Sequence, residues 1–305
     1  FIDTPARVEC VTRMARLGWL GMGFPEKYGG SPNPFPLAQF ILNAELDRSG
    51  APIIGKNVGT IASTIFHVAS EEMKMEFLPR IFRNEGQWAI TYTEPNAGTD
   101  LGSMQCRAID KGDHFEVTGM KHYITSAHFC RWHWMALRTD PDAPKHKGIS
   151  IFIVDHDTPG IRLSRMDTIG REGTTHRTNQ VFFDQMKIPR SRLVGELNKG
   201  FYYMMQALDY ERFAILSFAS RVRRFNKIVD WYKNADFSGE RPATDPYTRR
   251  ALARMSARIE VGTMLERMAI CKAQYEVPAV EAAEGTHQVQ GKLRKLIPDL
   301  SLIHI

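Results

Sequence analysis

The chain has 305 residues, of which 43% are hydrophobic and 24% are charged. These proportions are typical of globular proteins and exclude disordered and collagen-like classes, while the length predicts about two domains, or three small ones. No stretch approaches the roughly 20 apolar residues that span a bilayer. The first five residues, FIDTP, contain neither a basic nor an apolar segment, so no signal peptide is expected.

The charge balance favours anionic partners. Lys and Arg number 40 and Asp and Glu number 34, so the net charge is +6. This excess is not concentrated in one tail, so nucleic-acid binding is not expected. A phosphate-bearing cofactor or substrate also fits the positive charge.

The cysteines (Cys10, Cys106, Cys130 and Cys271) are far apart and form no CxxC pair. We therefore expect no metal site and no redox pair, and unpatterned thiols are typical of the reducing cytoplasm.

The first zone of the chain, up to about residue 88, is helical. Apolar periodicity predicts helices over 8–20, 36–48 and 73–82. Gly50 follows Asp47, Arg48 and Ser49 in the position where a glycine commonly ends a helix.

The second zone, about 89–196, is predicted to be a sheet. Segments 105–109 and 114–118 flank a polar turn and form a hairpin. Further strands are predicted at 122–125, 132–138, 149–154, 161–166 and 180–183. Short strands separated by turn signals indicate a compact antiparallel barrel or sandwich.

The third zone, from Gly200 onward, returns to helix. Its predicted apolar stripe consists of Leu252, Met255, Ile259, Val261, Leu265 and Met268. An arginine cluster lies in the same segment: Arg249, Arg250, Arg254, Arg258 and Arg267. The cluster is interpreted either as a solvated helix face or as a surface that faces an anion. The resulting order of helices, strands and helices matches neither a doubly wound sheet nor a TIM barrel.

Several common motifs are absent from the sequence. Gly18, Gly21 and Gly23 do not follow the GxGxxG order, and there is no P-loop and no GxSxG elbow. His128 and His133 flank Cys130 without an acidic partner at ligand spacing. We interpret both histidines as surface or barrel-edge residues.

The most informative segment is TYTEPNAGTD at residues 91–100. It leaves a strand, turns at Glu-Pro-Asn and then presents Ala-Gly-Thr-Asp. Small residues allow backbone N–H groups to approach an anion, and Thr99 adds a hydroxyl donor. An ordinary loop with an aspartate cap is the alternative.

This segment closely resembles the signature T-E-P-x-A-G-S-D of the acyl-CoA dehydrogenase family. Other matches follow in order along the chain: LGWLG at 17–21, PEKYGG at 25–30, GMKHYIT at 119–125 and LDYER at 208–212. The resemblance implies an α+β multidomain fold with a helical N-terminal domain (1–88), an antiparallel β-domain (89–196) and a C-terminal helical bundle (197–305).

The resemblance also implies FAD as the cofactor and an acyl-CoA as the substrate. The flavin-contacting positions that it implies are Tyr92, Thr93, Gly98, Thr99, Tyr123, Ile124 and Thr125. Thr99 falls where a serine usually serves both the flavin pyrophosphate and the acyl-CoA. Tyr123 falls where an aromatic residue lines the flavin, and without the family context it would be interpreted as a barrel-core aromatic residue.

Glu211 is the candidate catalytic base. It follows Leu208 at a spacing of three and precedes Ile215, Phe218 and Val222 at helical spacings, which places it on an apolar stripe. Desolvation there would raise the pKa of this carboxyl group towards a value useful for a base. A partly exposed glutamate paired with an arginine is the alternative.

The resemblance supports the assignment of the base, because one branch of the family places its base at this helix position. Another branch places it on a loop much nearer the C-terminus. Arg212 matches an arginine beside the substrate, and Asp209 lies in the same substrate-lining stretch.

The match is incomplete in two places. Segment 231–242 is a poor match to the family pattern R-x-x-F-G-x-P, whose arginine reaches the flavin of a neighbouring subunit. The first helices and the C-terminal end of the family also have no counterpart, so a fragment is expected.

The function expected from the resemblance is α,β-dehydrogenation of an acyl-CoA in a cytoplasmic homo- or hetero-oligomer, usually a homotetramer, with electron-transfer flavoprotein as the acceptor. The alternatives are a non-catalytic or half-site subunit of a heteromer, acyl-CoA oxidase-type chemistry, and nucleic-acid binding through the arginine-rich helices.

Overall fold

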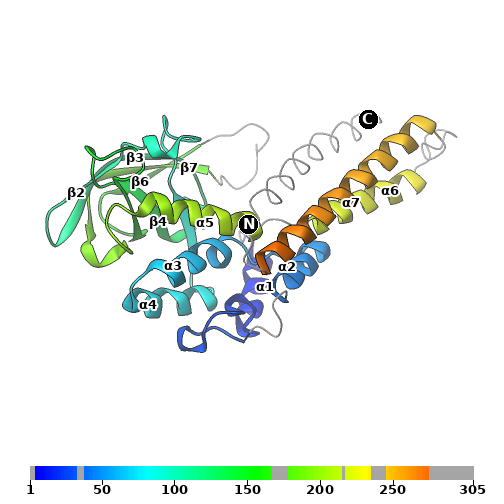
Figure 1. Cartoon of the computed structure of the whole chain (residues 1–305), viewed down its shortest axis with the longest axis horizontal. Helices are drawn as coiled ribbons and strands as arrows, with labels where there is room; N and C mark the ends of the chain where they lie inside the picture. Colours follow the sequence, from blue (N-terminus) through cyan, green and yellow to red (C-terminus); the bar gives the residue numbers. More distant parts are fainter. Residues whose placement is uncertain (1–3, 33–37, 167–177, 215–216, 235–244, 275–305) are drawn as a thin grey trace. The chain divides into compact units, whose positions relative to one another are not determined.

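A computed structural model describes residues 4–32, 38–166, 178–214, 217–234 and 245–274, with side chains for all of these except 209–214 and 269–274. The helices are α1 (Pro5–Arg16), α2 (Ala38–Ser49), α3 (Ser63–Val68), α4 (Glu71–Phe82), α5 (Gly200–Ala214), α6 (Ala219–Asn234) and α7 (Pro246–Gln274) (Figure 1). The strands are β1 (Gln87–Thr91), β2 (Arg107–Asp110), β3 (His114–Thr125), β4 (Cys130–Arg138), β5 (Ile149–Asp155), β6 (Ile161–Arg165), β7 (Thr178–Pro189) and β8 (Leu193–Val194).

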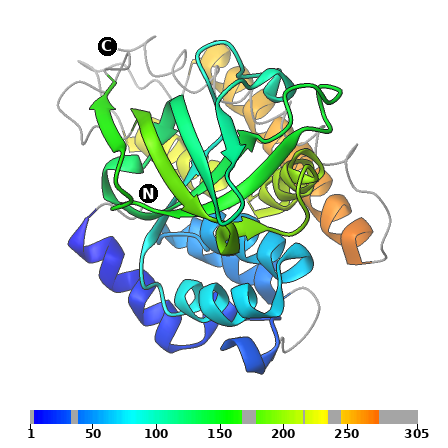
Figure 2. The same ribbon diagram turned by 90° about the vertical axis from the view of Figure 1, so that its left-hand side faces the viewer.

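The chain forms two compact units. One consists of Phe1–Met14, Pro32–Gly55 and Glu211–Ile305, and the other of Ala15–Ser31 and Lys56–Tyr210. The second unit contains the whole sheet, together with α3 and α4, which Figures 1 and 2 show on one side of it.

The eight strands form one sheet in the order β6-β7-β3-β2-β4-β5-β8, with β1 also paired to β4. Most pairs are antiparallel, as predicted, and the β2–β3 hairpin is confirmed. Two pairs, β1–β4 and β2–β4, are parallel, which the purely antiparallel expectation missed. The long connection from β1 to β4, residues 92–129, is what permits parallel pairing.

Two further elements differ from the sequence prediction. The strands predicted at 114–118 and 122–125 are one continuous strand, β3, whose register with β7 shifts twice along its length. A helical stretch covering Asn57–Ala62 and α3 was not predicted. Its threonines, serine and glycine are poor helix formers, but Ile61, Ala62 and Ile65 are fully buried, so tertiary packing overrides propensity.

Helix α4 is fixed to the sheet by an aromatic cluster. The ring of Phe77 lies 5.7 Å from that of Trp88 on β1 and 6.0 Å from that of Trp132 on β4. The two tryptophans lie 5.0 Å apart, and the guanidinium of Arg192 covers Phe77 at 5.1 Å. Because all three rings are fully buried, they join the helical layer to the parallel β1–β4 pair.

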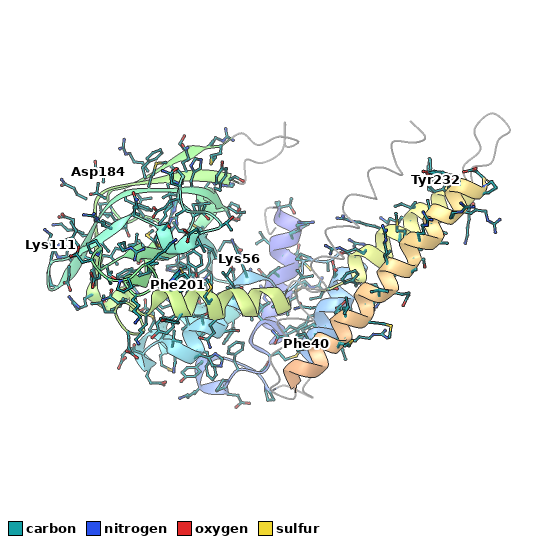
Figure 3. The ribbon with its side chains drawn as sticks, turned by 45° about the horizontal axis from the view of Figure 1, so that its top comes forward. Phe40, Lys56, Lys111, Asp184, Phe201 and Tyr232 are labelled. Atoms are coloured by element: carbon teal, nitrogen blue, oxygen red, sulfur yellow. The ribbon has the colours of Figure 1, made fainter. Side chains whose placement is uncertain are left out.

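The other unit packs α2 and α7 around α6. Gly50, with a φ of +84°, ends α2 as predicted. Met255 and Ile259 of the predicted α7 stripe are buried against Phe218, but Val261 and Met268 are each 52% exposed, so the stripe prediction is wrong beyond Ile259. The arginine cluster of α7 is exposed on the helix. Figure 3 shows α6 and α7 side by side, with Tyr232 labelled near the end of α6.

Glu266 of α7 lies in an apolar part of this unit. Its Oε2 accepts a hydrogen bond of 2.8 Å from the Phe218 amide, and both residues line a cavity of about 300 Å³ with Phe40 of α2 (labelled in Figure 3). Burial raises the pKa of Glu266 to about 6. The negative charge of Asp47 adds to this effect, and the positive charges of Arg267 and Arg221 oppose it.

Candidate functional site

The segment that leaves β1 forms a tight turn, as predicted. The Glu94 amide donates to the Ala97 carbonyl at 3.0 Å, and the Ala97 amide donates back to the Glu94 carbonyl at 3.2 Å. Pro95 and Asn96 are the exposed residues between them. The turn closes the loop on itself and points its tip at solvent.

A buried ion pair anchors the first half of the loop. Lys121 of β3 is fully buried, and its Nζ lies 2.8 Å from Glu94 Oε1 and 2.9 Å from the Tyr92 carbonyl oxygen. The Glu94 carboxylate also accepts the amides of Gln105 and Cys106, at 2.6 and 2.9 Å. Buried charges are tolerated only with such partners, so Glu94 and Lys121 hold the loop against β2 and β3.

Asp100 anchors the other end of the loop. Its carboxylate accepts a hydrogen bond of 2.6 Å from the Ser103 hydroxyl and pairs with Lys145. These hydrogen bonds, from Lys145 first and then Ser103, lower the pKa of Asp100. Gly98 and Thr99 lie between the two anchors and are exposed. The predicted anion-facing segment is therefore presented by a loop that is held at both ends.

Two cavities adjoin the loop. One of about 240 Å³ is lined by Glu94, Asn96, Gly119 and neighbours, and another of about 500 Å³ is lined by Arg107, Arg138, Lys145 and neighbours. The Arg138 guanidinium is used internally, since it donates to the carbonyls of Gly102, Met104 and Lys145. The cationic lining of the larger cavity suits an anionic group.

The end of β3 presents an aromatic ring. Tyr123 is 58% exposed and has a φ of +57°, at the place where the pairing of β3 with β7 skips from Lys121 to Ile124. Its ring stacks on that of His122, with centroids 4.3 Å apart. A non-glycine residue in this conformation is strained, and such strain concentrates at functional sites. Ile124 points into the core, and Thr125 is half-buried.

The structure brings two of the predicted segments together. The His122 amide donates to the Thr93 carbonyl at 2.8 Å, so the end of β1 lies beside the end of β3. Thr93 is half-buried. Tyr92 is only 5% exposed, and its hydroxyl accepts a 2.6 Å hydrogen bond from Trp134 Nε1. The Tyr92 ring thus belongs to the interior, where its carbonyl oxygen also accepts the hydrogen bond from Lys121.

The predicted substrate-side residues lie on α5. Asp209, Glu211 and Arg212 belong to this helix, and their side chains are outside the described set. The expectation of one helical stripe reaching Val222 is wrong, because Ser217 and Phe218 lie outside the helices and α6 begins at Ala219. Ile215 is outside the described residues.

Sequence reasoning missed some of the important residues. Lys121 lies on the same inward-facing side of β3 as Phe115 and Val117. A charged residue at an inward-facing position is the sequence signal that could have predicted a buried ion pair. The interpretation of His133 as a surface residue is wrong: it is fully buried, and burial lowers its pKa to about 3. His128 is exposed, as expected.

The chain matches family models along most of its length. The acyl-CoA dehydrogenase N-terminal domain matches residues 3–85, the middle domain 89–186 and the C-terminal domain 198–287. Acyl-CoA dehydrogenase FadE29 of Mycobacterium tuberculosis is 34% identical over 290 residues, covering 94% of this chain and 74% of that protein. The chain belongs to the acyl-CoA dehydrogenase family. Members of this family are oxidoreductases and flavoproteins, and membership supports acyl-CoA dehydrogenation as the general reaction.

Solved structures confirm the fold of this family member. The Tcur3481-Tcur3483 steroid ACAD has a TM-score of 0.87 at 31% identity, covering 98% of this chain and 77% of that one. The ChsE4-ChsE5 complex from Mycobacterium tuberculosis has a TM-score of 0.84 at 28% identity, covering 97% and 80%. Among the described residues, no helix is long and apolar enough to cross a membrane.

Proposed function

We propose that the chain catalyses FAD-dependent α,β-dehydrogenation of an acyl-CoA thioester. The observation that carries the proposal is the signature loop, which the Glu94–Lys121 pair and Asp100 hold in place beside the exposed ring of Tyr123. Catalysis of this type depends on a preorganised site, and a loop anchored at both ends meets that need.

The residues present fit a flavin. An aromatic ring that is more than half exposed at a strained strand end offers a planar apolar face, which suits stacking against another ring system. The side chains of Tyr123, Thr125 and Thr93 would hold the ring, and Ile124 and Tyr92, which are buried, would support the site from the interior. When FAD is bound, it supplies a two-electron acceptor for the hydride that leaves the β-carbon of the substrate.

The exposed part of the signature loop would bind the phosphate-bearing ligands. Gly98 brings the backbone close to the surface without a side chain, and the Thr99 hydroxyl adds a donor beside it. The cationic cavity lined by Arg107 and Lys145 adjoins the same loop and favours anionic groups. We assign to Thr99 the binding of both the flavin pyrophosphate and the acyl-CoA. We assign to Asp209 and Arg212 the binding of the substrate.

Glu211 would act as the base. Its carboxylate takes the proton from the α-carbon of the thioester and becomes a carboxylic acid, so the carbon–carbon double bond forms as the second hydrogen leaves from the β-carbon. The reaction needs one carboxylate near the α-carbon, and α5 carries Glu211 directly beside the substrate-side positions Asp209 and Arg212.

Flavin reduction by substrate tests this function. The full-length flavoprotein would be titrated without oxygen against a panel of straight-chain, branched and steroid-side-chain acyl-CoA esters, the last because one structural relative is named a steroid ACAD. Bleaching of the flavin with release of the enoyl-CoA is expected for at least one ester. Flavin that stays oxidised with every ester would contradict the proposal. Peroxide formation in air would indicate an oxidase in place of a dehydrogenase that passes electrons to electron-transfer flavoprotein.

A second candidate function is a non-catalytic or half-site subunit of a heteromer. Two observations favour it: the poor match of segment 231–242, most of which lies outside the described residues, and structural relatives whose names join two components. The FAD content per chain decides the matter, measured for the chain alone and after co-expression with a partner of the same family. Full occupancy of the chain alone would remove this alternative.

A further inference from the structure

Three side chains with metal-binding atoms converge beneath the β4–β5 strand pair. The Cys130 Sγ lies 3.5 Å from His133 Nε2 and 3.5 Å from His156 Nδ1, and the two nitrogens are 3.1 Å apart. Cys130 and His133 are buried and His156 is half-buried, and all three belong to the unit that contains the sheet. The cluster plays no part in the reaction proposed above.

The sheet register fixes this arrangement. Cys130 opens β4, and His133, three residues later, pairs with Val154 of β5. His156 directly follows the end of β5, where its amide donates to the Arg131 carbonyl at 2.9 Å. The antiparallel ladder therefore brings the start of one strand and the end of the next to the same place. The spacing C-x-x-H in the sequence was the only local signal.

The triangle of donor atoms has the size that a tetrahedral zinc ion requires. With Zn–N bonds of about 2.05 Å and a Zn–S bond of about 2.3 Å, tetrahedral geometry separates two nitrogens by about 3.3 Å and sulfur from nitrogen by about 3.6 Å. The three separations observed are 3.1, 3.5 and 3.5 Å. All three separations agree with these tetrahedral values within about 0.2 Å.

The surroundings of His133 orient its ring for binding. Its Nδ1 lies 3.0 Å from the Thr91 hydroxyl oxygen, which itself lies 3.3 Å from the Ala89 carbonyl. A hydroxyl has one proton, and when Thr91 donates it to Ala89, Thr91 can only accept from His133 Nδ1–H. The Nε2 of His133 then carries a lone pair and faces Cys130 and His156. A hydrogen bond of this kind behind a metal-binding histidine is the usual means of fixing its tautomer.

Two charged side chains act on Cys130 in opposite directions. The positive charge of Lys56 (labelled in Figure 3) disfavours a cation and has the larger effect, and the negative charge of Asp157 favours one. His156 is the ligand with appreciable exposure, so the cluster approaches solvent on its side. Water can complete the coordination there.

We propose that Cys130, His133 and His156 form a binding site for Zn²⁺, with a thiolate, two imidazoles and a water molecule as ligands. One sulfur and two nitrogen donors in a tetrahedral arrangement are typical of zinc. On binding, the thiol proton leaves to solvent and no electrons are transferred. The ion ties the start of β4 to the end of β5.

Zinc content tests the proposal directly. The full chain would be incubated with ZnCl₂, freed of loosely bound metal by gel filtration and analysed by mass spectrometry for zinc. The wild type is expected to retain about one zinc ion per chain, and Cys130→Ala and His156→Asn less than about a tenth of that. Cys106→Ala is the matched control, because Cys106 is equally buried but outside the cluster, and it should retain zinc like the wild type.

X-ray absorption at the zinc edge identifies the ligands. One sulfur at about 2.3 Å with nitrogen or oxygen at about 2.0 Å is expected. A wild type that retains no more zinc than Cys130→Ala, or zinc without a sulfur ligand, would overturn the proposal and leave the cluster a hydrogen-bonded triad. Because His156 is half-buried, its variant should fold, and a Tm that zinc raises in the wild type but not in His156→Asn is a second readout. Flavin content is a separate quantity, so this result does not depend on the proposed reaction.

Discussion

Lys121→Met should destabilise the sheet unit strongly while leaving its shape intact. The substitution removes the 2.8 Å ion pair to Glu94 and the 2.9 Å hydrogen bond to the Tyr92 carbonyl, both in the interior. Breaking a buried ion pair from one side costs about 3–5 kcal/mol, because the remaining charge is left uncompensated. Glu94 keeps two backbone amide donors, so we expect the lower end of this range, about 3 kcal/mol.

Urea unfolding followed by tryptophan fluorescence measures this loss. Trp88, Trp132 and Trp134 are buried in the sheet and report on this unit. With an m-value of about 2 kcal/mol/M, the midpoint should fall by roughly 1.5 M without a change in slope. Adding Glu94→Gln in the Lys121→Met background removes the orphaned charge and should recover part of the loss, which a double-mutant cycle quantifies.

Lys111→Met is the matched control for this experiment. Lys111, labelled in Figure 3, pairs with Glu116 at 3.9 Å on the surface of the same β-domain, and its side chain is 44% exposed. Exposed pairs contribute about 0–1 kcal/mol, so its midpoint should hardly move. If Lys121→Met behaved like this control, the loop would not depend on the buried pair, and the reasoning would be refuted.

Two further predictions concern stability. Because the folded state keeps Glu266 protonated up to a pKa of about 6, against an ordinary value of 4.5, the free energy of unfolding should fall by about 2 kcal/mol as the pH rises through this window. Glu266→Gln should remove that slope in urea titrations at pH 4 to 8, and an unchanged slope would contradict the assignment. Gly160→Ala should cost more stability than Gly112→Ala, since both have positive φ but only at Gly160 would the new Cβ meet a backbone oxygen, that of Asp184, at 2.5 Å (Asp184 is labelled in Figure 3). If the two variants lowered the Tm equally, the backbone would have moved to relieve the clash at Gly160, and the prediction would be wrong.

The sequence predicts those elements whose local signals agree with their packing. Helix α4 has regular apolar spacing and a serine cap, with Ser70 accepting the Met73 amide, and the β2–β3 hairpin has a turn with Gly112 at a φ of +96°. The turn after β1 is likewise encoded by Pro95 and Asn96. In each case the deciding contacts lie within a few residues of one another, where propensity and turn chemistry act.

What the sequence alone does not reveal depends on contacts between distant residues. Lys121 and Glu94 are 27 positions apart, and neither carries a local sign that the other compensates its charge. His156 joins Cys130 only through the strand register, across 26 positions. The end of one helix and the start of the next between α5 and α6 were also not predicted. The apolar residues from Leu208 to Val222 keep a helical spacing, although Ser217 and Phe218 lie outside the helices. Apolar periodicity predicts on which face of a helix or strand a residue lies, whereas tertiary packing decides where the helix or strand ends.

The most direct test of the proposed reaction is single-turnover flavin reduction in Glu211→Gln. The variant and the wild type would be mixed without oxygen with an acyl-CoA that reduces the wild type, and the flavin absorbance followed over time. Loss of a positioned general base costs about 10²–10⁴-fold in rate, so bleaching should slow by at least about 100-fold while FAD remains bound. Glu196→Gln, an exposed glutamate just before α5, is the control and should bleach normally. Bleaching of Glu211→Gln at the wild-type rate would contradict the account.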